Sequence, residues 1–168
     1  AIDAIGLHDG DLARLCDVFY IGGTKNGAMF GEALVLVRDE FKDHFRFNMK
    51  QHGAILAKGW MIGVQFEELF RDNLYLELGK RSVALAKTLK DAFAKCNIPL
   101  LAEAPTNQIF PILPDELAEK INEKYLTTFQ CKPDEEHTCL RFCTSWATNE
   151  QAVEDFARDL ENWTLSVS

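Results

Sequence analysis

A lysine between two glycine turns stands in the stretch Asp17-Val18-Phe19-Tyr20-Ile21-Gly22-Gly23-Thr24-Lys25-Asn26-Gly27. The apolar, β-rich run from Val18 to Ile21 predicts a short buried strand, and the glycine-rich residues after it predict a turn. The run from Glu32 to Val37 predicts a second strand, and the short connection favours an antiparallel pair. Lys25 therefore follows directly on a predicted buried strand.

Lys25 is a candidate covalent nucleophile. A lysine in that role has to be partly desolvated, so that its pKa falls and free amine is present. The end of a buried strand would supply such surroundings, and the flanking glycines leave room for a flat ring. Thr24 offers a hydroxyl beside that ring or beside a phosphate. From the pattern alone, an exposed lysine in a surface turn is the commoner alternative.

Arg141 is the second candidate, because it lies inside the apolar stretch from Cys139 to Cys143. Arginine is seldom placed in the middle of a buried strand without a partner. Its planar guanidinium can hold a carboxylate through two parallel hydrogen bonds. The pattern leaves two interpretations open: a site for a substrate carboxylate, or a structural ion pair with an Asp or Glu.

The rest of the chain alternates predicted helices and strands. In chain order they are a helix over 9–15, a helix over 41–70, a long amphipathic helix over 73–96, a strand over 107–113, a helix over 115–126, a strand over 138–145 and a helix over 149–163. Pro111 interrupts the strand over 107–113 and predicts an edge position. Thr148 or Asn149 is the expected cap of the last helix. The residues after 73 thus predict a small sheet covered by helices, whereas two strands before them cannot form a stable sheet alone.

Charge and cysteine content narrow the function classes. The chain of 168 residues carries 18 basic and 26 acidic side chains, a net charge of -8 that repels nucleic acids and anionic membranes. No apolar run is long enough to span a bilayer. Five scattered cysteines do not form a disulfide framework, which predicts a reduced, cytoplasmic protein. No spacing of His, Cys, Asp or Glu predicts a metal site.

The stretch around Lys25 resembles the lysine segment of the threonine aldolase / aromatic amino acid β-eliminating lyase family, whose members are pyridoxal-phosphate enzymes. The resemblance continues downstream in the expected order. It rests on Gly31-Glu32-Ala33, Lys50-Gln51-His52-Gly53-Ala54-Ile55-Leu56-Ala57-Lys58-Gly59, Thr106-Asn107-Gln108-Ile109-Phe110 and Arg141-Phe142-Cys143-Thr144-Ser145-Trp146-Ala147-Thr148. It implies the α/β fold of type I, the aspartate-aminotransferase-like fold. Family members are about twice as long, so the resemblance makes this chain their C-terminal half: 1–72 as the end of the large cofactor-binding domain and 73–168 as the small α+β domain.

The resemblance also implies roles for individual residues. Lys25 matches the lysine that binds pyridoxal 5'-phosphate covalently, with Thr24 beside the cofactor, and Arg141 matches the arginine that holds the substrate carboxylate. Lys50 or Lys58 is a weaker candidate for the phosphate, since solvated lysines are common. The missing N-terminal half of the enzyme is expected to supply the residue that stacks on the ring, most of the phosphate site and the Asp that pairs with the pyridine nitrogen. Homodimers or homotetramers are expected.

The predicted function is cleavage of L-threonine, or a similar β-hydroxy amino acid, to glycine and an aldehyde. Two alternatives remain. One is β-elimination from aromatic or sulfur amino acids on the same Lys25 and Arg141, and the other is a truncated, non-catalytic module.

Overall fold

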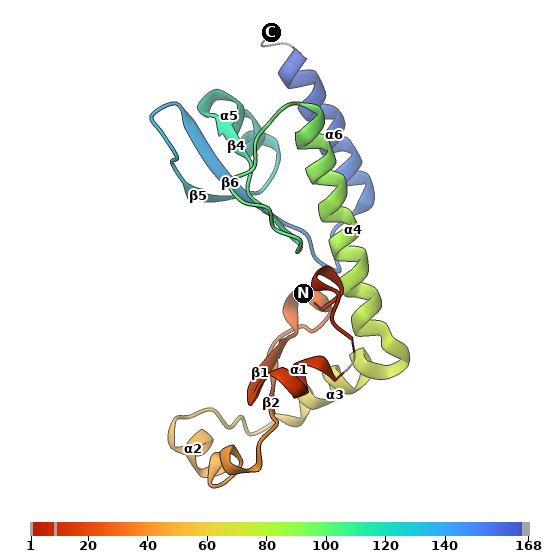
Figure 1. Cartoon of the computed structure of the whole chain (residues 1–168), viewed down its shortest axis with the longest axis vertical. Helices are drawn as coiled ribbons and strands as arrows, with labels where there is room; N and C mark the ends of the chain where they lie inside the picture. Colours follow the sequence, from red (N-terminus) through yellow and green to blue (C-terminus); the bar gives the residue numbers. More distant parts are fainter. Residues whose placement is uncertain (1, 9, 166–168) are drawn as a thin grey trace. The chain divides into compact units, whose positions relative to one another are not determined.

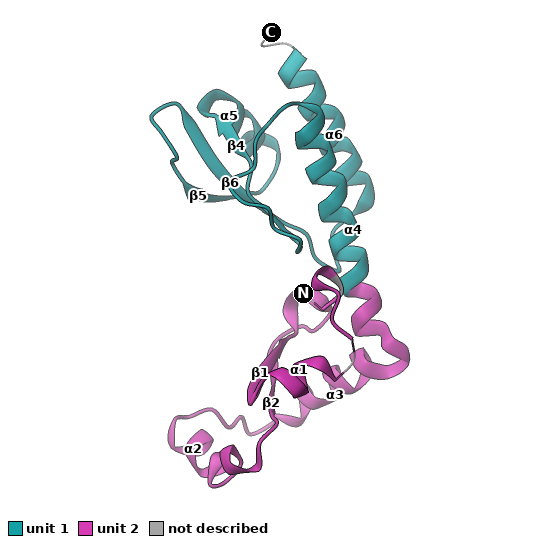
Figure 2. Cartoon of the chain, viewed as in Figure 1, with its two compact units in different colours: residues 1, 79–168 teal, residues 2–78 magenta. Residues whose placement is uncertain are grey.

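The computed structural model describes residues 2–8 and 10–165, which form the elements drawn in Figure 1. The chain divides into two compact units, coloured separately in Figure 2. In chain order we call Ile2–Leu78, drawn in magenta, the first unit and Gly79–Ser168, drawn in teal, the second unit. The boundary falls inside the long helix α4 (Leu74–Lys95). Among the described residues, no helix combines the length and the apolar character that crossing a membrane requires.

The first unit holds a two-stranded ladder and short helices. Its elements are η1 (Asp3–Ile5), α1 (Asp11–Leu15), β1 (Val18–Gly22), η2 (Thr24–Asn26), β2 (Glu32–Leu36), η3 (Asp39–Phe41), α2 (Phe45–Gln51), α3 (Trp60–Phe70) and η4 (Arg71–Asn73). Strands β1 and β2 are antiparallel, with Val18 opposite Leu36 and Gly22 opposite Glu32. The predicted pair of strands is therefore confirmed.

Two predictions about this unit are wrong. Strand β1 is not buried: alternate residues are exposed, Tyr20 by 68%, because within the described part of the chain β1 has a neighbouring strand only at β2. The helix predicted over 41–70 is interrupted between Gln51 and Trp60. Helix α2 closes around Gly53, where the Ala54 N–H donates to the Met49 carbonyl at 2.8 Å, a bond typical of helix C-termini.

The second unit is a small antiparallel sheet with helices. After α4 come β3 (Gln108–Ile109), β4 (Ile112–Pro114), α5 (Asp115–Lys124), β5 (Thr128–Cys131), β6 (His137–Cys143) and α6 (Glu150–Leu165). Strand β6 is central, with β3 and β4 along one side in a single register and β5 on the other. Pro111 separates β3 from β4, which confirms the predicted interruption. The predicted edge position is wrong, because Leu100 pairs with Pro111 on the side away from β6. Strand β5 was not predicted, because it is short and mostly exposed.

One continuous core lies in this second unit. Many of its members come from helices and from one face of the sheet: Leu85, Leu89, Phe93, Ile109, Leu113, Leu117, Ile121, Leu140, Phe142, Phe156 and Leu160. The Phe93 ring lies 5.2 Å from Phe142 and 5.6 Å from Phe156 between ring centres. Edge-on aromatic packing of this kind adds to the burial of apolar area. Successive residues of β6 point to opposite faces, so Leu140 and Phe142 leave the other face to Cys139, Arg141 and Cys143.

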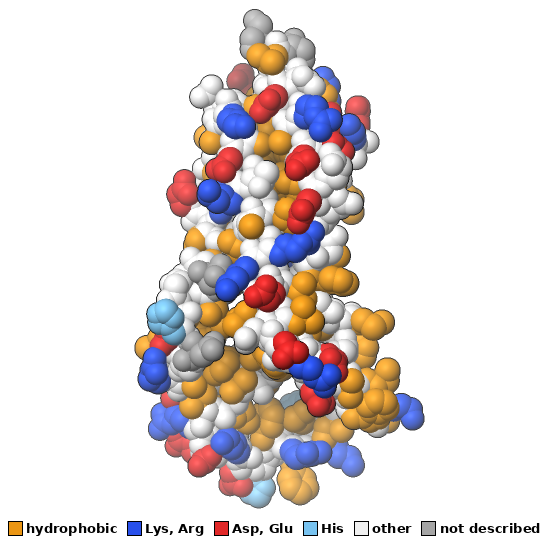
Figure 3. Space-filling view, turned by 90° about the vertical axis from the view of Figure 1, so that its right-hand side faces the viewer, with side chains coloured by type: hydrophobic (Ala, Val, Ile, Leu, Met, Phe, Trp, Pro, Cys, Tyr) orange, Lys and Arg blue, Asp and Glu red, His pale blue; other side chains and the backbone are white. Residues whose placement is uncertain are grey.

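Apolar side chains also lie at the surface of the first unit. Figure 3 shows hydrophobic side chains gathered in the lower part of the view, where this unit lies. The most exposed large ones are Ile5, Leu15, Tyr20, Met29, Phe47 and Trp60. Exposed apolar area of this extent is typical of a surface that another polypeptide covers.

Candidate functional site

The Lys25 turn is built by two glycines that no other residue could replace without strain. Lys25 lies in η2, directly after β1. A Cβ on Gly23 would stand 2.6 Å from the Gly31 carbonyl oxygen, so the backbone approaches there too closely for a side chain. Gly27 ends the turn at φ 110°, in the left-handed region that glycine adopts readily. The glycines thus fix the position of the lysine backbone at the end of the strand.

Two side-chain hydrogen bonds, from Tyr75 and Asn26, connect this turn to the start of α4. The Tyr75 hydroxyl donates to the Gly22 carbonyl at 2.8 Å, and the Asn26 amide donates to the Tyr75 carbonyl at 2.6 Å. Burial, the larger effect, raises the pKa of Tyr75 above its ordinary value, so the hydroxyl stays a donor at neutral pH. Both side chains lie within the first unit. No sequence pattern singles out Tyr75, because a single tyrosine at the start of a helix can have many roles.

The Lys25 side chain is unengaged in the part of the chain that the structure describes. Its amine has neither a hydrogen bond nor an ion pair with a described residue, and neither does the Thr24 hydroxyl. Both side chains are exposed. The desolvated surroundings predicted for Lys25 are therefore wrong for this chain by itself, because its strand lies in a half-exposed two-stranded ladder. Lys50 in α2 and Lys58 before α3 are also exposed.

Arg141 lies in the middle of β6, the central strand of the second unit. It stands opposite Thr128 of β5, on the face of β6 away from Leu140 and Phe142. Its Nε is buried and has no hydrogen-bond partner in residues 2–8 and 10–165. A buried N–H of a charged group is costly to leave unpaired. Among the described residues no Asp or Glu pairs with Arg141, which removes the structural ion pair as an explanation within this chain.

The turn after Arg141 is locked to α4 through buried polar groups. The Thr144 hydroxyl donates to the Ser82 carbonyl at 2.7 Å, and the Thr144 N–H donates to the Asn107 carbonyl at 3.0 Å. The Asn107 amide donates back to the Thr144 carbonyl at 2.6 Å. Thr144 and Ser82 are both buried. The end of β6 is thus fixed by bonds that leave Arg141 itself free.

Arg81 adds a second clamp on the same turn. Its guanidinium donates to the carbonyls of Trp146 at 2.8 Å and Thr148 at 3.0 Å, and it forms an ion pair with Glu150 at 3.2 Å. Sequence reasoning did not single out Arg81. Asn107 and Thr144 both lie within the motifs that carry the family resemblance, but no sequence pattern predicts the hydrogen bonds between them.

The residues present fit a pyridoxal phosphate cofactor and an amino-acid substrate. The free amine of Lys25, at a strand end between glycines, suits a covalent bond to an aldehyde. The unpaired guanidinium of Arg141 suits a carboxylate. The structure brings Lys25 and Thr24 together in one turn. Arg141 belongs to the other unit, and each unit is described by itself.

Comparisons with known proteins identify relatives over most of the chain. No family model matches the chain. It is 24% identical over 150 residues to the low specificity L-threonine aldolase of Pseudomonas aeruginosa and 26% identical to that of a Pseudomonas species. Each alignment covers 86% of this chain and 41% of the relative. The chain therefore spans less than half the length of these curated relatives.

The structure resembles the threonine aldolase of Leishmania major, with a TM-score of 0.89 and 42% sequence identity. That match covers 92% of this chain and 45% of the other, a share that fits the expected half of a family member. The chain is thus similar in sequence and in structure to part of the threonine aldolases, and it has their α/β fold of type I.

Proposed function

We propose that the protein containing this chain is a pyridoxal-phosphate-dependent aldehyde-lyase that cleaves L-threonine, or a similar β-hydroxy amino acid, to glycine and an aldehyde. The observation that carries the proposal is a pair of unengaged cationic groups. Lys25 has an amine without a partner in the described chain, and the buried Nε of Arg141 likewise has none there. The similarity to threonine aldolases supports the reaction class.

Each of these residues has one task in the proposed reaction. Lys25 holds the cofactor through Nζ, and Thr24 lies next to it with a free hydroxyl. When bound, pyridoxal phosphate supplies an electron sink for negative charge at the substrate Cα. Arg141 binds the α-carboxylate with its guanidinium fork and so fixes the orientation of the Cα–Cβ bond that breaks. Asn107, Thr144 and Arg81 keep the strand end that carries Arg141 in place.

We further propose that residues 1–72 complete the large cofactor-binding domain of the enzyme and that 73–168 form its small domain. The N-terminal part of the protein would supply the remaining cofactor contacts. A homodimer or homotetramer in the cytoplasm is the assembly that we expect. The unpaired cysteines and the exposed apolar side chains of the first unit support these assignments.

The test is borohydride reduction of the full-length protein, followed by peptide mapping. We expect one pyridoxyl adduct per chain on the peptide that contains Lys25. Lys25→Ala should lose the adduct and the cofactor absorbance, whereas Lys87→Ala, at an exposed lysine of α4 that forms only a surface ion pair with Asp91, should keep both. An adduct on another lysine would overturn the assignment.

Substrate turnover separates the proposed reaction from its alternatives. Release of glycine and acetaldehyde from L-threonine is the expected result. Release of pyruvate or another keto acid from tryptophan, tyrosine or cysteine, without threonine cleavage, would instead identify a β-eliminating lyase. A full-length protein that binds no cofactor would identify a non-catalytic module.

A further inference from the structure

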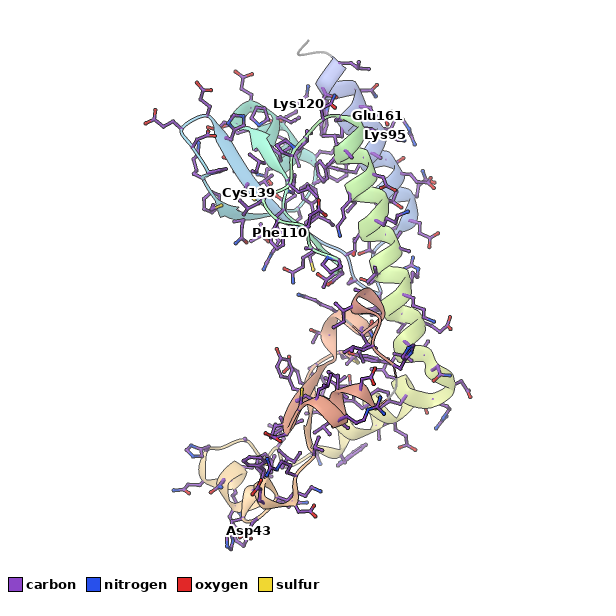
Figure 4. All side chains as sticks on the ribbon, in the orientation of Figure 1. Asp43, Lys95, Phe110, Lys120, Cys139 and Glu161 are labelled. Atoms are coloured by element: carbon purple, nitrogen blue, oxygen red, sulfur yellow. The ribbon has the colours of Figure 1, made fainter. Side chains whose placement is uncertain are left out.

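Two cysteines face each other across the edge of the small sheet. Cys131, the last residue of β5, stands directly opposite Cys139 of β6 in the antiparallel register, just after an irregularity in β5. Figure 4 labels Cys139 on its strand. Opposed residues of an antiparallel pair have Cα atoms about 4.5 to 5.5 Å apart and side chains on the same face. A disulfide requires Cα atoms about 4.4 to 6.8 Å apart, so the pairing meets the condition.

The two thiols differ in their exposure to solvent. Cys139 is completely buried and Cys131 is half-buried, so Cys131 is the more accessible of the two to a reagent. This arrangement resembles an attacking and a resolving thiol.

Other cysteines of this unit cannot replace either partner. Cys143 lies on the same strand as Cys139, four residues further, which places it about 13 Å away along an extended chain. Cys96 lies after α4, and its sulfur accepts a hydrogen bond from the Thr164 hydroxyl at 3.5 Å. The register therefore selects one pair among the four cysteines of the second unit.

We propose that Cys131 and Cys139 are a redox modification site that forms an intramolecular disulfide by exchange with a low-molecular-weight disulfide. The Cys131 thiolate attacks one sulfur of the reagent, whose S–S bond breaks and releases one thiolate. The Cys139 thiolate then attacks the Cys131 sulfur of the mixed disulfide and releases the second. Both cysteines are oxidised, the reagent is reduced to two thiols, and the two cysteine protons pass to the released thiolates.

Burial governs the rate of the second step. It is the largest cause that raises the pKa of Cys139 to about 11, with smaller effects from Cys131. The Cys139 thiolate is therefore scarce at neutral pH, and the cross-link forms slowly. Disulfides of cytoplasmic proteins are typically transient and redox-sensing, which agrees with a slow, reversible bond.

The Cys131–Cys139 disulfide would form close to Arg141 in the sheet. Cys139 lies two residues from Arg141 on the same strand, and both residues point to the same face of β6. Thr128, opposite Arg141, lies on the same strand β5 as Cys131. Oxidation would thus tie the outer strand to the one that carries Arg141.

The test uses the reduced full-length protein, incubated under native conditions with oxidised glutathione and then alkylated. Trypsin does not cut before Pro133, so residues 125–141 are released as one peptide that contains both cysteines. We expect this peptide to be about 2 Da lighter than its reduced form and to resist alkylation until dithiothreitol is added. Glu-C cuts after Glu135 or Glu136, and the two halves should then separate only after reduction.

Three variants make the assignment specific. Cys131→Ser should lose the cross-link, and Cys139→Ser should trap glutathione on Cys131. Cys143→Ser, which removes an exposed cysteine of the same strand, should keep the cross-link.

Full alkylation of the peptide after native incubation would overturn the proposal. So would a stable glutathione adduct on Cys131 beside a free Cys139 in the unaltered protein. A link from either cysteine to Cys143 or Cys96 would overturn it as well. Because the peptide map of the unaltered protein is decisive, the conclusion does not depend on how well the variants fold.

Discussion

Single residues carry the chemistry of this chain, and Arg141 is the clearest case. It is a charged side chain in a central strand, and its buried Nε lacks a partner among the described residues. Proteins rarely leave such a group without a function. The same unit also contains Tyr125, a tyrosine whose hydroxyl is engaged by a carboxylate. Both residues lead to predictions that a single substitution can test.

Arg141→Lys should raise the KM for L-threonine about 10- to 100-fold. A lysine keeps the positive charge but loses the planar fork, and hydrogen bonds to charged groups contribute about 1.5 to 3 kcal/mol each. Steady-state kinetics of the full-length enzyme would measure the effect. Arg158→Lys is the matched control, because Arg158 forms only an exposed ion pair with Asp155. An unchanged KM in Arg141→Lys would exclude carboxylate binding at this residue.

Tyr125 should make the protein less stable at high pH. Burial first, and then its hydrogen bond to Asp159 at 2.6 Å, raise the pKa of Tyr125 far above its ordinary value of 10.0. The folded state therefore binds the proton more tightly, so the stabilisation is complete below about pH 10 and is lost as the pH rises beyond it. Between about pH 8 and pH 11, the unfolding temperature of Tyr125→Phe should decrease less than that of the unaltered protein. Tyr20 is an exposed tyrosine, so the unfolding temperature of Tyr20→Phe should decrease as much as that of the unaltered protein.

At the scale of elements, local sequence decides where helices begin and how turns close. Asn149 caps α6, since its side-chain oxygen accepts from the N–H groups of Gln151 at 2.8 Å and Ala152 at 3.4 Å. That outcome confirms one of the two caps expected from the sequence. The η2 turn depends in the same way on Gly27.

Asn149→Ala should lower the free energy of unfolding by about 1 kcal/mol, because two N–H groups at the helix start lose their acceptor. Thermal or urea unfolding would measure the change. The control is Asn162→Ala, at an exposed position inside α6. It should not lower the free energy of unfolding, since alanine favours helices. Equal effects at both positions would contradict the capping role.

Gly27→Ala should destabilise the first unit by more than about 1 kcal/mol, because alanine is strained at φ 110°. Borohydride labelling at Lys25 should weaken with it, since the turn positions the lysine. Gly63→Ala offers a matched control: Gly63 lies in α3, and an added Cβ would meet open space. That variant should be neutral or more stable by up to about 1 kcal/mol. Normal labelling in Gly27→Ala would contradict the link between turn geometry and Lys25.

For the whole molecule, the two units differ in how much core they possess. Every member of the main core cluster lies between Leu85 and Leu160. Among the described residues of the first unit, the buried apolar side chains are Ala28, Phe66 and Leu69. Burial of apolar area is the main favourable term in folding, so the units should differ in their independence.

Residues 79–168, expressed alone, should fold cooperatively and remain monomeric, whereas residues 2–78 alone should not give a cooperative transition. Thermal melts followed by circular dichroism, with light scattering for the association state, would measure both. The expected binding of a hydrophobic dye to the full chain, and its loss in the fragment 79–168, would place the exposed apolar surface on the first unit. A cooperative melt of the fragment 2–78 would contradict this reading.

The sequence by itself determined the order of most elements and the candidate residues. Strand β2, helix α4, the interruption at Pro111 and the cap at Asn149 follow from local patterns, because helix periodicity, β-propensity, proline and capping side chains act within a few residues. Lys25 and Arg141 stood out because their charges lie next to apolar runs.

Only the tertiary structure decided what these residues touch. It shows that β1 is exposed, because burial depends on neighbouring elements that a local sequence pattern does not contain. It also shows β5, which forms by pairing with β6, a strand outside its own local sequence. It placed Tyr75 against the Lys25 turn, and it set Cys131 opposite Cys139. Contacts between residues distant in the chain depend on strand register and helix packing, which a single sequence read locally does not encode.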